Sequence, residues 1–256
     1  MVSFVPSNAR HFNGFQDTNL SVSYSTGKEA YTDPGLFVGH TCGYPYLLNW
    51  QASHKLVCVP IFDVDGCQGN QYCSWFITHP GYKGASVEDF RNRVVALNGH
   101  NSNSGMNVLR YEISKMNPGD AFFSRAIISG GHAASVELIS QQKADLAAID
   151  AVTFAHLKKG GLLDPGKIIL IGQSEFTTGL PFIMPRIMSG VMSRFPIFQT
   201  DETSITAAMN NALVAIDQRH RQQLGIRSFE IVTHSDYDKI GELKTTAENL
   251  GYPVLI

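Results

Sequence analysis

The chain lacks the features of a membrane protein or a nucleic-acid-binding protein. Only 16% of its 256 residues are charged, and 20 Lys and Arg nearly balance 22 Asp and Glu, so the formal net charge is −2. Without a run of like charges there is no electrostatic footprint for a nucleic acid or an anionic membrane. The longer apolar stretches, such as Lys167–Gly172, are far shorter than the roughly 20 residues that span a bilayer. Any anion that the protein binds must therefore be held by a few local groups and not by a broad positive surface. The sequence predicts no membrane-inserted segment.

Cysteines are few, and no zinc-binding spacing is present. Cys42, Cys58, Cys67 and Cys73 form no C-x-x-C pair, so we expect no metal site and no cofactor. Cys67 and Cys73 lie in one Gly-rich loop and could form a disulfide in an oxidising compartment, although reduced thiols are the expectation.

The first ten residues contain neither the cationic nor the apolar region of a secretory signal. As written, the sequence predicts a cytoplasmic chain. The alternative is a trimmed mature form that works in the periplasm.

Hydrophobic residues make up 43% of the chain, which is enough for a buried core. Short apolar runs alternate with helix-length segments throughout, a pattern typical of an α/β fold. The expected strands are Ser21–Ser25, Gly35–His40, Lys55–Phe62, Cys73–Thr78, Arg93–Asn98, Ala126–Ser129, Ala144–Asp150 and Lys167–Gly172. The expected helices are Ser104–Ser114, Ala133–Gln142, Ala151–Lys158 and Asp201–Ile216.

The block from about Glu88 to Leu170 alternates strands and helices and predicts a parallel α/β lobe. We therefore expect lobe 1 to be discontinuous, with residues 1–78 and 172–256, and lobe 2 to contain residues 79–171. The extended segments Trp75–Thr78 and Ile169–Gln173 would connect the lobes, with a ligand cleft between them.

The most informative segment is Val94–Asn107, in which an apolar strand ends in a polar loop and a helix follows. The first backbone N–H groups of such a helix are unpaired and partly positive, and Ser102 and Ser104 add hydroxyl donors. A tetrahedral oxyanion could therefore be held there without a lysine. The simpler alternative is that one serine is an N-cap and that Gly105 makes a tight turn.

A second strand, ending at Ser129, runs into Gly130, Gly131 and His132 and then into a helix. Ligands of open parallel sheets bind at the carboxyl ends of the strands, so we expect His132 to lie near the serine loop. A third strand delivers Asp150 to the same edge. Asp150 is either a ligand contact or the N-cap of the next helix, and the sequence favours neither.

Four motifs give the chain a family resemblance: Thr41–Tyr46, the S-x-S-G core of Asn98–Gly105, Ser129–His132 with Ala144–Asp150, and Gly179–Phe182. Together they resemble the substrate-binding proteins of phosphate, phosphite and phosphonate ABC transporters, the PhnD-like branch of the type 2 periplasmic-binding fold. The resemblance covers roughly residues 35 to 185. It implies a two-lobed α/β fold that closes over a small phosphorus oxyanion, in transport or sensing, with an ABC permease or a sensor as partner.

The resemblance also implies ligand-binding residues. In that family the S-x-S-G serines, the adjacent amides and the G-x-H histidine hold the oxyanion, and a tyrosine contributes from the other lobe. Carried over, the binding residues are Tyr44, Tyr46, Ser102, Asn103, Ser104, Gly105, His132 and Asp150. Either tyrosine could instead be a buried aromatic residue with its hydroxyl bonded to the backbone.

Two other functions remain open. Related folds include small-molecule enzymes, so Cys42, Cys67 or Cys73 could form a catalytic pair with His40 or His132. No G-x-S-x-G or H-E-x-x-H signature supports that alternative, and we assign no catalytic residue. A ligand-sensing domain that contacts a partner protein is the weaker third possibility.

Overall fold

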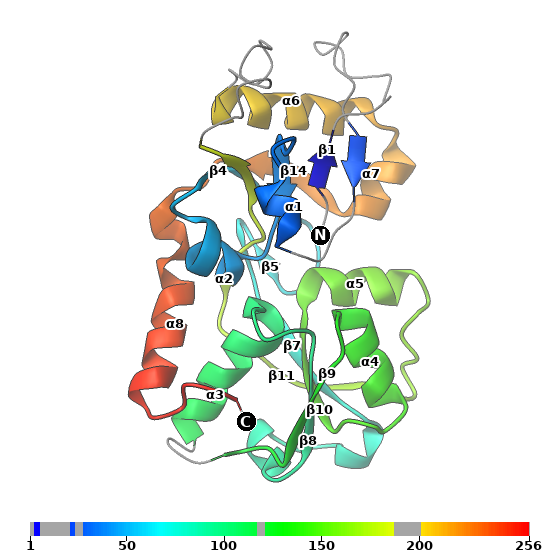
Figure 1. The fold of residues 1–256 in the computed structure, drawn as a ribbon. Helices are drawn as coiled ribbons and strands as arrows, with labels where there is room; N and C mark the ends of the chain where they lie inside the picture. The colour runs from blue at the N-terminus through cyan, green and yellow to red at the C-terminus, as the bar shows by residue number, and fades with distance from the viewer. Residues whose placement is uncertain (1–2, 6–20, 24–27, 117–120, 187–200, 256) are drawn as a thin grey trace. The chain divides into compact units, whose positions relative to one another are not determined.

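The apolar runs of the sequence form the strands of two separate mixed α/β units (Figure 1). This computed structural model describes residues 3–5, 21–23, 28–116, 121–186 and 201–255. Unit 1 contains residues 1–61 and 179–236, and unit 2 contains residues 62–178 and 237–256. These boundaries differ from the expected ones, because the strand Ser74–Thr78 and the C-terminal helix both belong to unit 2.

Unit 1 is built on a six-stranded sheet in the order β14-β4-β13-β3-β1-β2. Its strands are β1 (Ser3–Val5), β2 (Ser21–Ser23), β3 (Val38–His40), β4 (His54–Phe62), β13 (Phe182–Pro185) and β14 (Ile226–Glu230). Its helical segments are α1 (Glu29–Thr32), α2 (Gly43–Pro45), the π-helical turn η1 (Tyr46–Trp50), α6 (Glu202–Ala215) and α7 (Gln218–Leu224). Residues 24 and 25 of the expected strand Ser21–Ser25 lie outside the described residues.

The helices of unit 1 begin and end where local chemistry predicts. The carboxylates of Asp201 and Asp217 accept hydrogen bonds from backbone N–H groups in the first turns of α6 and α7. Helix α7 ends at Gly225, whose φ of 65° is the left-handed conformation that glycine adopts without strain. The apolar face of α6 packs onto β4 and its neighbours through a core of Phe37, Val38, Val57, Cys58, Met184 and Ile205.

Unit 2 contains a five-stranded sheet in the order β11-β7-β10-β8-β9 and a small sheet in the order β12-β6-β5. The strands are β5 (Cys67–Gln68), β6 (Gln71–Tyr72), β7 (Ser74–Thr78), β8 (Val94–Leu97), β9 (Arg125–Ile128), β10 (Leu146–Asp150), β11 (Ile169–Gln173) and β12 (Thr177–Thr178). The 3-10 helices are η2 (Pro80–Tyr82), η3 (Val87–Phe90) and η7 (His234–Tyr237), the last of which crosses the boundary between the units.

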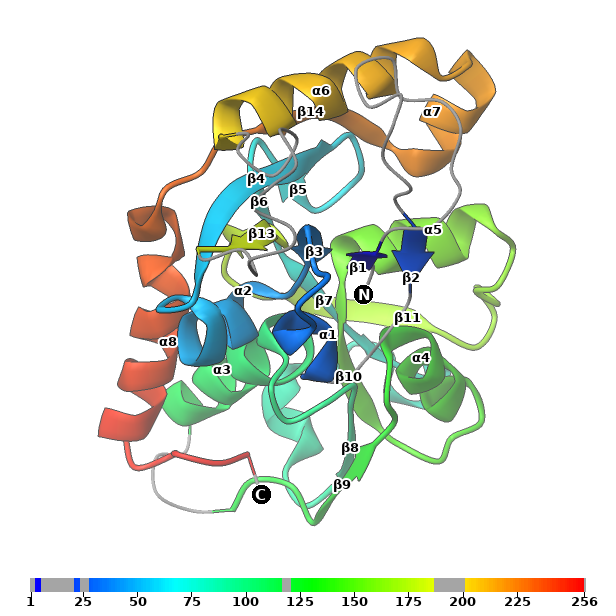
Figure 2. The same cartoon turned by 45° about the horizontal axis from the view of Figure 1, so that its top comes forward.

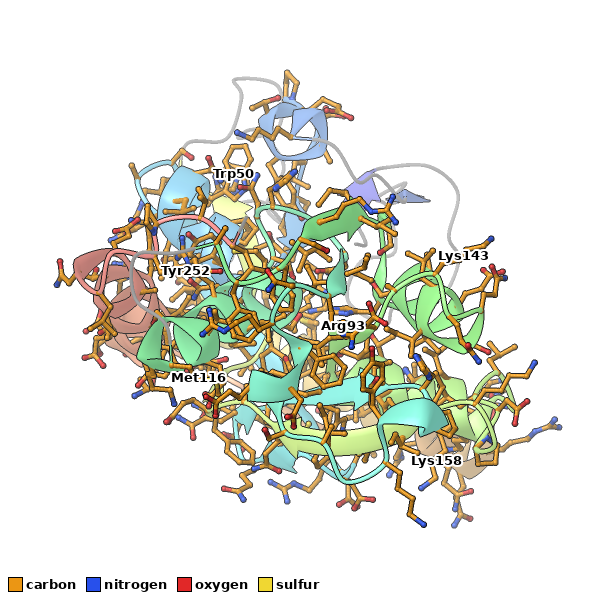
Figure 3. The ribbon with its side chains drawn as sticks, turned by 90° about the horizontal axis from the view of Figure 1, so that it is seen from below. Trp50, Arg93, Met116, Lys143, Lys158 and Tyr252 are labelled. Atoms are coloured by element: carbon orange, nitrogen blue, oxygen red, sulfur yellow. The ribbon has the colours of Figure 1, made fainter. Side chains whose placement is uncertain are left out.

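The remaining helices of unit 2 flank its main sheet on both faces (Figure 1, Figure 2). The π-helical turn η4 (Asn103–Asn107), α3 (Val108–Met116) and α8 (Asp238–Asn249) lie on one face, and α4 (His132–Ser140) and α5 (Ala151–Lys159) lie on the other. The core between the sheet and α4 contains Ile77, Ala96, Val136, Ile139, Ala144, Ala147, Ile149 and Ile168. Lys143 and Lys158 lie at the outside of this layer (Figure 3).

The main sheet of unit 2 is mixed, because it includes β7, which was expected outside the parallel lobe. Strands β8, β9 and β10 are parallel to one another, as expected. Strand β7 lies between β10 and β11 and is antiparallel to both. Its Phe76 and Ile77 are 2% and 0% exposed, because an interior position buries both faces of the strand.

Candidate functional site

The loop after β8 begins a helix with Ser102 as its N-cap. The Ser102 Oγ accepts a hydrogen bond of 3.0 Å from the backbone N–H of Gly105. The π-helical turn η4 follows and continues directly into α3, so this end carries the partial positive charge of a long helix. The N-cap alternative for Ser102 is thus confirmed. Because Ser102 occupies the cap position, the hydroxyl of Ser104 forms other contacts.

The Ser104 hydroxyl meets His132, the first residue of α4. Ser104 Oγ lies 2.8 Å from His132 Nε2 and 3.5 Å from Ser102 Oγ. Asn98, which follows β8, places its Nδ2 3.2 Å from the same histidine nitrogen. Because β8 and β9 are adjacent and parallel, their carboxyl ends bring the serine loop and His132 together, as the sequence predicted.

Asp150 at the end of β10 completes the cluster and has two contacts. Its Oδ1 accepts a hydrogen bond of 2.7 Å from the backbone N–H of Thr153, so it is the N-cap of α5. Its Oδ2 lies 3.2 Å from His132 Nε2. The side chains of Asp150 and His132 are each 9% exposed. The N-cap alternative for Asp150 is therefore confirmed. A contact between its other oxygen and a ligand stays a prediction.

Gly105 is required by the close approach of its neighbours. A β-carbon at position 105 would stand 2.7 Å from Asn98 Cγ and 3.3 Å from His132 Cε1, and closer still to Asn98 Oδ1. Such distances are below ordinary van der Waals contact, so only glycine lets the helix start lie against these two side chains.

Burial determines the charge of the histidine. Desolvation lowers the pKa of His132 below its usual value, while Asp150 and the carbonyl of Ala148 oppose that change. A neutral imidazole at neutral pH can donate or accept at Nε2. Ser104 and Asp150 both contact this one nitrogen, whereas a serine–histidine–aspartate relay uses opposite nitrogens of the ring.

Asn103 contributes to the site through the framework behind it. Its side chain is fully buried, and its Nδ2 donates a 2.9 Å hydrogen bond to Thr177 Oγ1. Its Oδ1 accepts from Asn107 Nδ2, which also donates to the carbonyl of Ile240 in α8. Both polar atoms of the Asn103 side chain thus bond to residues that support the helix start. Because these bonds would have to break first, direct contact of this side chain with an oxyanion is disfavoured.

The framework continues to the C-terminal segment. Arg110 donates from Nη2 to Asn107 Oδ1 at 2.8 Å and from Nη1 to the carbonyl of Pro253 at 2.6 Å. The hydroxyl of Tyr252 accepts a hydrogen bond from the backbone N–H of Phe122, and its ring lies buried near α3 (Figure 3). The last residues of unit 2 therefore support the same helix that carries Ser104.

Tyr44 and Tyr46 belong to α2 and η1 of unit 1, and both are buried. The Tyr46 hydroxyl lies 3.4 Å from Nδ1 of His234, and their rings meet edge to face. Burial raises the pKa of Tyr46, so its hydroxyl stays protonated and can donate. A contact between either tyrosine and an oxyanion stays a prediction.

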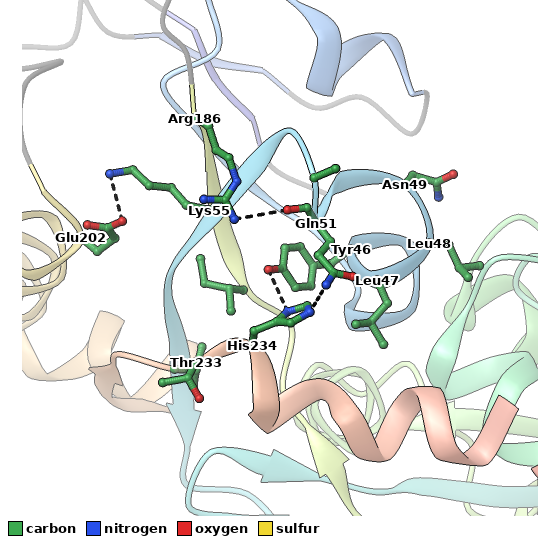
Figure 4. A pocket seen from close by; sticks show the side chains of 13 residues that line it. Tyr46, Leu47, Leu48, Asn49, Gln51, Lys55, Arg186, Glu202, Thr233 and His234 are labelled. Carbon is green, nitrogen blue, oxygen red and sulfur yellow. Dashed lines mark hydrogen bonds and ion pairs between the residues drawn. The ribbon is translucent and has the colours of Figure 1, made fainter. Parts of the chain in front are cut away.

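Unit 1 contains a cavity of about 570 Å³ with Tyr46 in its wall (Figure 4). His234 contacts both Tyr46 and Gln51 in this wall, and Lys55 pairs with Glu202 at 2.9 Å. The Arg186 Nη2 donates a 3.3 Å hydrogen bond to the carbonyl of Gln51. The polar groups of the wall therefore bond mainly to one another.

Burial disfavours the thiolate form of Cys67 and Cys73. None of the four described cysteines forms a disulfide. Burial raises the pKa of Cys67 to about 12 and that of Cys73 to about 11, so both are protonated at neutral pH. Within the described ranges, no cluster of three or more His, Cys, Asp or Glu side chains could hold a metal ion. No helix in the same part of the chain is long and apolar enough to cross a membrane.

Sequence reasoning missed Asn98, Asn107 and Arg110 as parts of the site. Asn98 stands at the end of a strand, where a polar residue is a usable signal. Asn107 and Arg110 lie three residues apart on one helix face, but their partners Ile240 and Pro253 are more than 100 residues away. Only the tertiary structure identifies such contacts.

A family model described as "ABC transporter, phosphonate, periplasmic substrate-binding protein" matches residues 28–237 of the chain. A comparison with curated protein sequences finds no match.

Solved structures of similar fold include PhnD1 from Prochlorococcus marinus in complex with methylphosphonate. The TM-score is 0.68 at 13% identity, over 86% of this chain and 81% of that chain. A binding protein component of an ABC phosphonate transporter from Pseudomonas aeruginosa gives 0.66 at 15% identity, over 86% and 71%. The alkanesulfonate-binding protein SsuA from Xanthomonas axonopodis, bound to MOPS, gives 0.59 at 13% identity, over 89% and 81%. At these identities the likeness shows the fold, that of two-lobed periplasmic binding proteins.

Proposed function

The chain belongs to the family of periplasmic substrate-binding proteins of phosphonate ABC transporters, and on that premise we propose that it holds a small phosphorus oxyanion at the helix start after β8. As a member, it is a small-oxyanion-binding protein that acts in transport. The proposal assigns the ligand to the cluster of Ser102, Ser104, Gly105, His132 and Asp150.

One observation carries this assignment: Ser104 and His132 meet at 2.8 Å beside the first turn of a long helix. The first backbone N–H groups of a helix point away from its body, and the helix dipole favours a negative charge there. In this turn the Gly105 N–H donates to Ser102 Oγ, which holds the serine at the helix start. Ser102 and Ser104 are 8% and 5% exposed, so an anion that reaches them loses most of its water and gains strong hydrogen bonds. Phosphate oxygens are common ligands of such helix starts.

The cluster supports binding without chemical change to the ligand. Ser104 and Asp150 both contact Nε2 of His132. A catalytic relay needs the serine and the carboxylate on opposite ring nitrogens, so this arrangement does not activate Ser104 as a nucleophile. We therefore assign Ser104 and His132 as binding residues, with an ABC permease as the partner that receives the ligand. The family is described as periplasmic, and we propose the same location for this chain.

Isothermal titration calorimetry with phosphate, phosphite, methylphosphonate and sulfate tests the proposal. We expect at least one phosphorus oxyanion to bind. At about 100 times its dissociation constant, such a ligand stabilises the fold by ~2.7 kcal/mol, which a thermal melt detects independently.

Two serine variants locate the site. Ser104→Ala removes a hydroxyl that would bond to a charged ligand, so the affinity should fall by about tenfold or more. Ser124→Ala removes an exposed hydroxyl of the same unit, which bonds to the carbonyl of Arg93, and should bind normally. Equal affinities of the two variants, or no binding of any phosphorus oxyanion, would refute the assignment.

A further inference from the structure

The cavity of unit 1 is lined by an arginine that has no opposite charge beside it. Apart from His234, the ionisable side chains that line it other than tyrosine are Lys55, Arg186 and Glu202. Lys55 pairs with Glu202 at 2.9 Å. Arg186 forms no ion pair with any described residue, and the sequence from 187 to 200 contains no Asp or Glu. The positive charge of Arg186 is therefore left unbalanced in the wall of the cavity.

Arg186 directly follows β13 and is held in place by two hydrogen bonds. Its backbone N–H donates to the carbonyl of Ser53 at 2.9 Å, and its Nη2 donates to the carbonyl of Gln51 at 3.3 Å. Figure 4 shows the guanidinium beside the Gln51 carbonyl. No other hydrogen bond joins this side chain to a described residue, so most of the N–H donors of the guanidinium remain for a ligand. A carboxylate fits the planar fork of an arginine with two parallel hydrogen bonds.

The charge of Arg186 acts on a wall that is partly apolar. Burial raises the pKa of Tyr46 and the charge of Arg186 opposes this rise, so the charge reaches the Tyr46 side of the cavity. Leu47, Leu56 and Val232 also line the cavity and offer apolar contact. The volume of about 570 Å³ lies in the range of small-molecule pockets, roughly 300–1,000 Å³. Such a wall suits a monoanion with an apolar body better than a strongly hydrated inorganic ion.

We propose that this cavity binds a small organic monocarboxylate through Arg186, with the apolar part of the acid against Leu56 and Val232. Every lining residue belongs to unit 1, and none is among the residues proposed to hold the phosphorus oxyanion. The inference therefore goes beyond the proposed function and does not rest on it. The guanidinium orients the carboxylate, and burial of the apolar part adds affinity.

Benzoate, benzamide and acetate are the probes for this cavity. Benzoate has both parts of the proposed ligand, benzamide has the same shape without the charge, and acetate has the charge with little apolar surface. In ligand-observed NMR titrations of the wild-type protein, we expect benzoate to bind at least about tenfold more tightly than either of the other two. Equal binding of benzamide would refute recognition of the carboxylate, and equal binding of acetate would refute the apolar contact.

Substitutions of Arg186 locate the anchor. Arg186→Gln removes the charge and should weaken benzoate binding by about tenfold or more. Arg186→Lys keeps the charge without the planar fork, so it should weaken binding by a smaller factor, and it provides the test if a thermal melt shows that Arg186→Gln does not fold. Arg219→Gln is the matched control, because Arg219 is an exposed arginine of α7 in the same unit and does not line the cavity. This variant should bind benzoate as the wild-type protein does.

Methylphosphonate distinguishes this cavity from the proposed oxyanion site. Benzoate should still bind to the wild-type protein in the presence of excess methylphosphonate. Displacement of benzoate would show that the two ligands share one site, and the inference would be wrong while the proposed function stands. No benzoate binding by the wild-type protein, or equal benzoate affinities of Arg186→Gln and Arg219→Gln, would also overturn it. If methylphosphonate does not bind, the proposed function fails, and the benzoate titrations still decide this inference.

Discussion

Gly105 packs so closely against Asn98 that the first turn of the helix after β8 has no room for a β-carbon. The same approach keeps the Asn98 amide 3.2 Å from His132 Nε2. The close packing of Gly105 therefore fixes the position of the Asn98 side chain beside His132. Adding one methyl group at position 105 tests this relationship.

Gly105→Ala should displace Asn98 and widen the gap to His132, because the new β-carbon overlaps the Asn98 side chain. We expect the affinity for the oxyanion to fall by at least about tenfold. The control is Gly99→Ala in the same loop, since a β-carbon at position 99 meets nothing within 4 Å. Calorimetric titration of both variants with methylphosphonate provides the measurement. Equal binding by the two would show that the close packing at Gly105 does not matter for the ligand.

Ligand binding should be coupled to proton uptake at His132. Burial lowers the pKa of this imidazole in the free protein, and a bound anion favours its protonated form. The pKa therefore rises on binding, so this contribution to affinity is present at low pH and is lost as the pH rises through the pKa of the complex.

Titrations in buffers of different ionisation enthalpy count the protons. His132→Gln keeps a polar side chain but cannot titrate, so it should take up fewer protons than the wild-type protein at about pH 6. Any uptake that remains in the variant belongs to the ligand itself. Identical proton counts would mean that His132 keeps its charge on binding.

Acid should destabilise the protein through His40. Its Nε2 contacts the carbonyl of Leu180 at 3.1 Å, its ring stacks on Phe182, and burial lowers its pKa to about 4. Between the usual value of 6.5 and about 4, the unfolded chain binds more protons than the folded chain. Stability from this group is therefore complete above pH 6.5 and declines as the pH falls, by up to about 3 kcal/mol.

His40→Gln should reduce the slope of unfolding free energy against pH in this window, as measured by urea denaturation. His220→Gln is a suitable control, because His220 is a solvent-exposed histidine. If His40→Gln and the wild-type protein lose stability in parallel, other groups control the acid transition.

Asn107→Leu should destabilise unit 2 by about 2–4 kcal/mol, because it leaves the buried Arg110 guanidinium without its 2.8 Å acceptor. Oxyanion affinity should also fall, since Asn107 supports Asn103 at the helix start. Asn249→Ala, at an exposed position in α8, should change stability by less than about 0.5 kcal/mol. Denaturant titration compares the two variants. Equal stabilities would mean that Arg110 finds another acceptor.

The sequence predicted the parts of the fold that depend on local pattern. The strands that carry Ser102, His132 and Asp150 are where their apolar runs placed them, and the helices after them begin within a residue or two of the expected positions. The prediction that these three residues lie together followed from one rule, that functional groups of an open parallel sheet gather at the carboxyl ends of its strands.

What the sequence did not predict depends on distant partners. The antiparallel placement of β7 is decided by its pairing with β10 and β11, and no local residue signals that direction. Helix α8 was missed because its buried face is narrow, with only Ile240, Leu243 and Ala247. The roles of Asn103 and Asn107 were hidden for the same reason, since a polar residue in a helix start reveals its acceptor only once the chain has folded.

Unit 2 is assembled from residues 62–178 and residues 237–256, with all of 179–236 belonging to unit 1. During synthesis, the helix that carries Ser104 is complete long before the carbonyls of Ile240 and Pro253 leave the ribosome. The bonds from Asn107 and Arg110 therefore form only after the last residues are made. Pairing across such a long stretch of chain is slow, so the binding site should be among the last parts of the protein to mature.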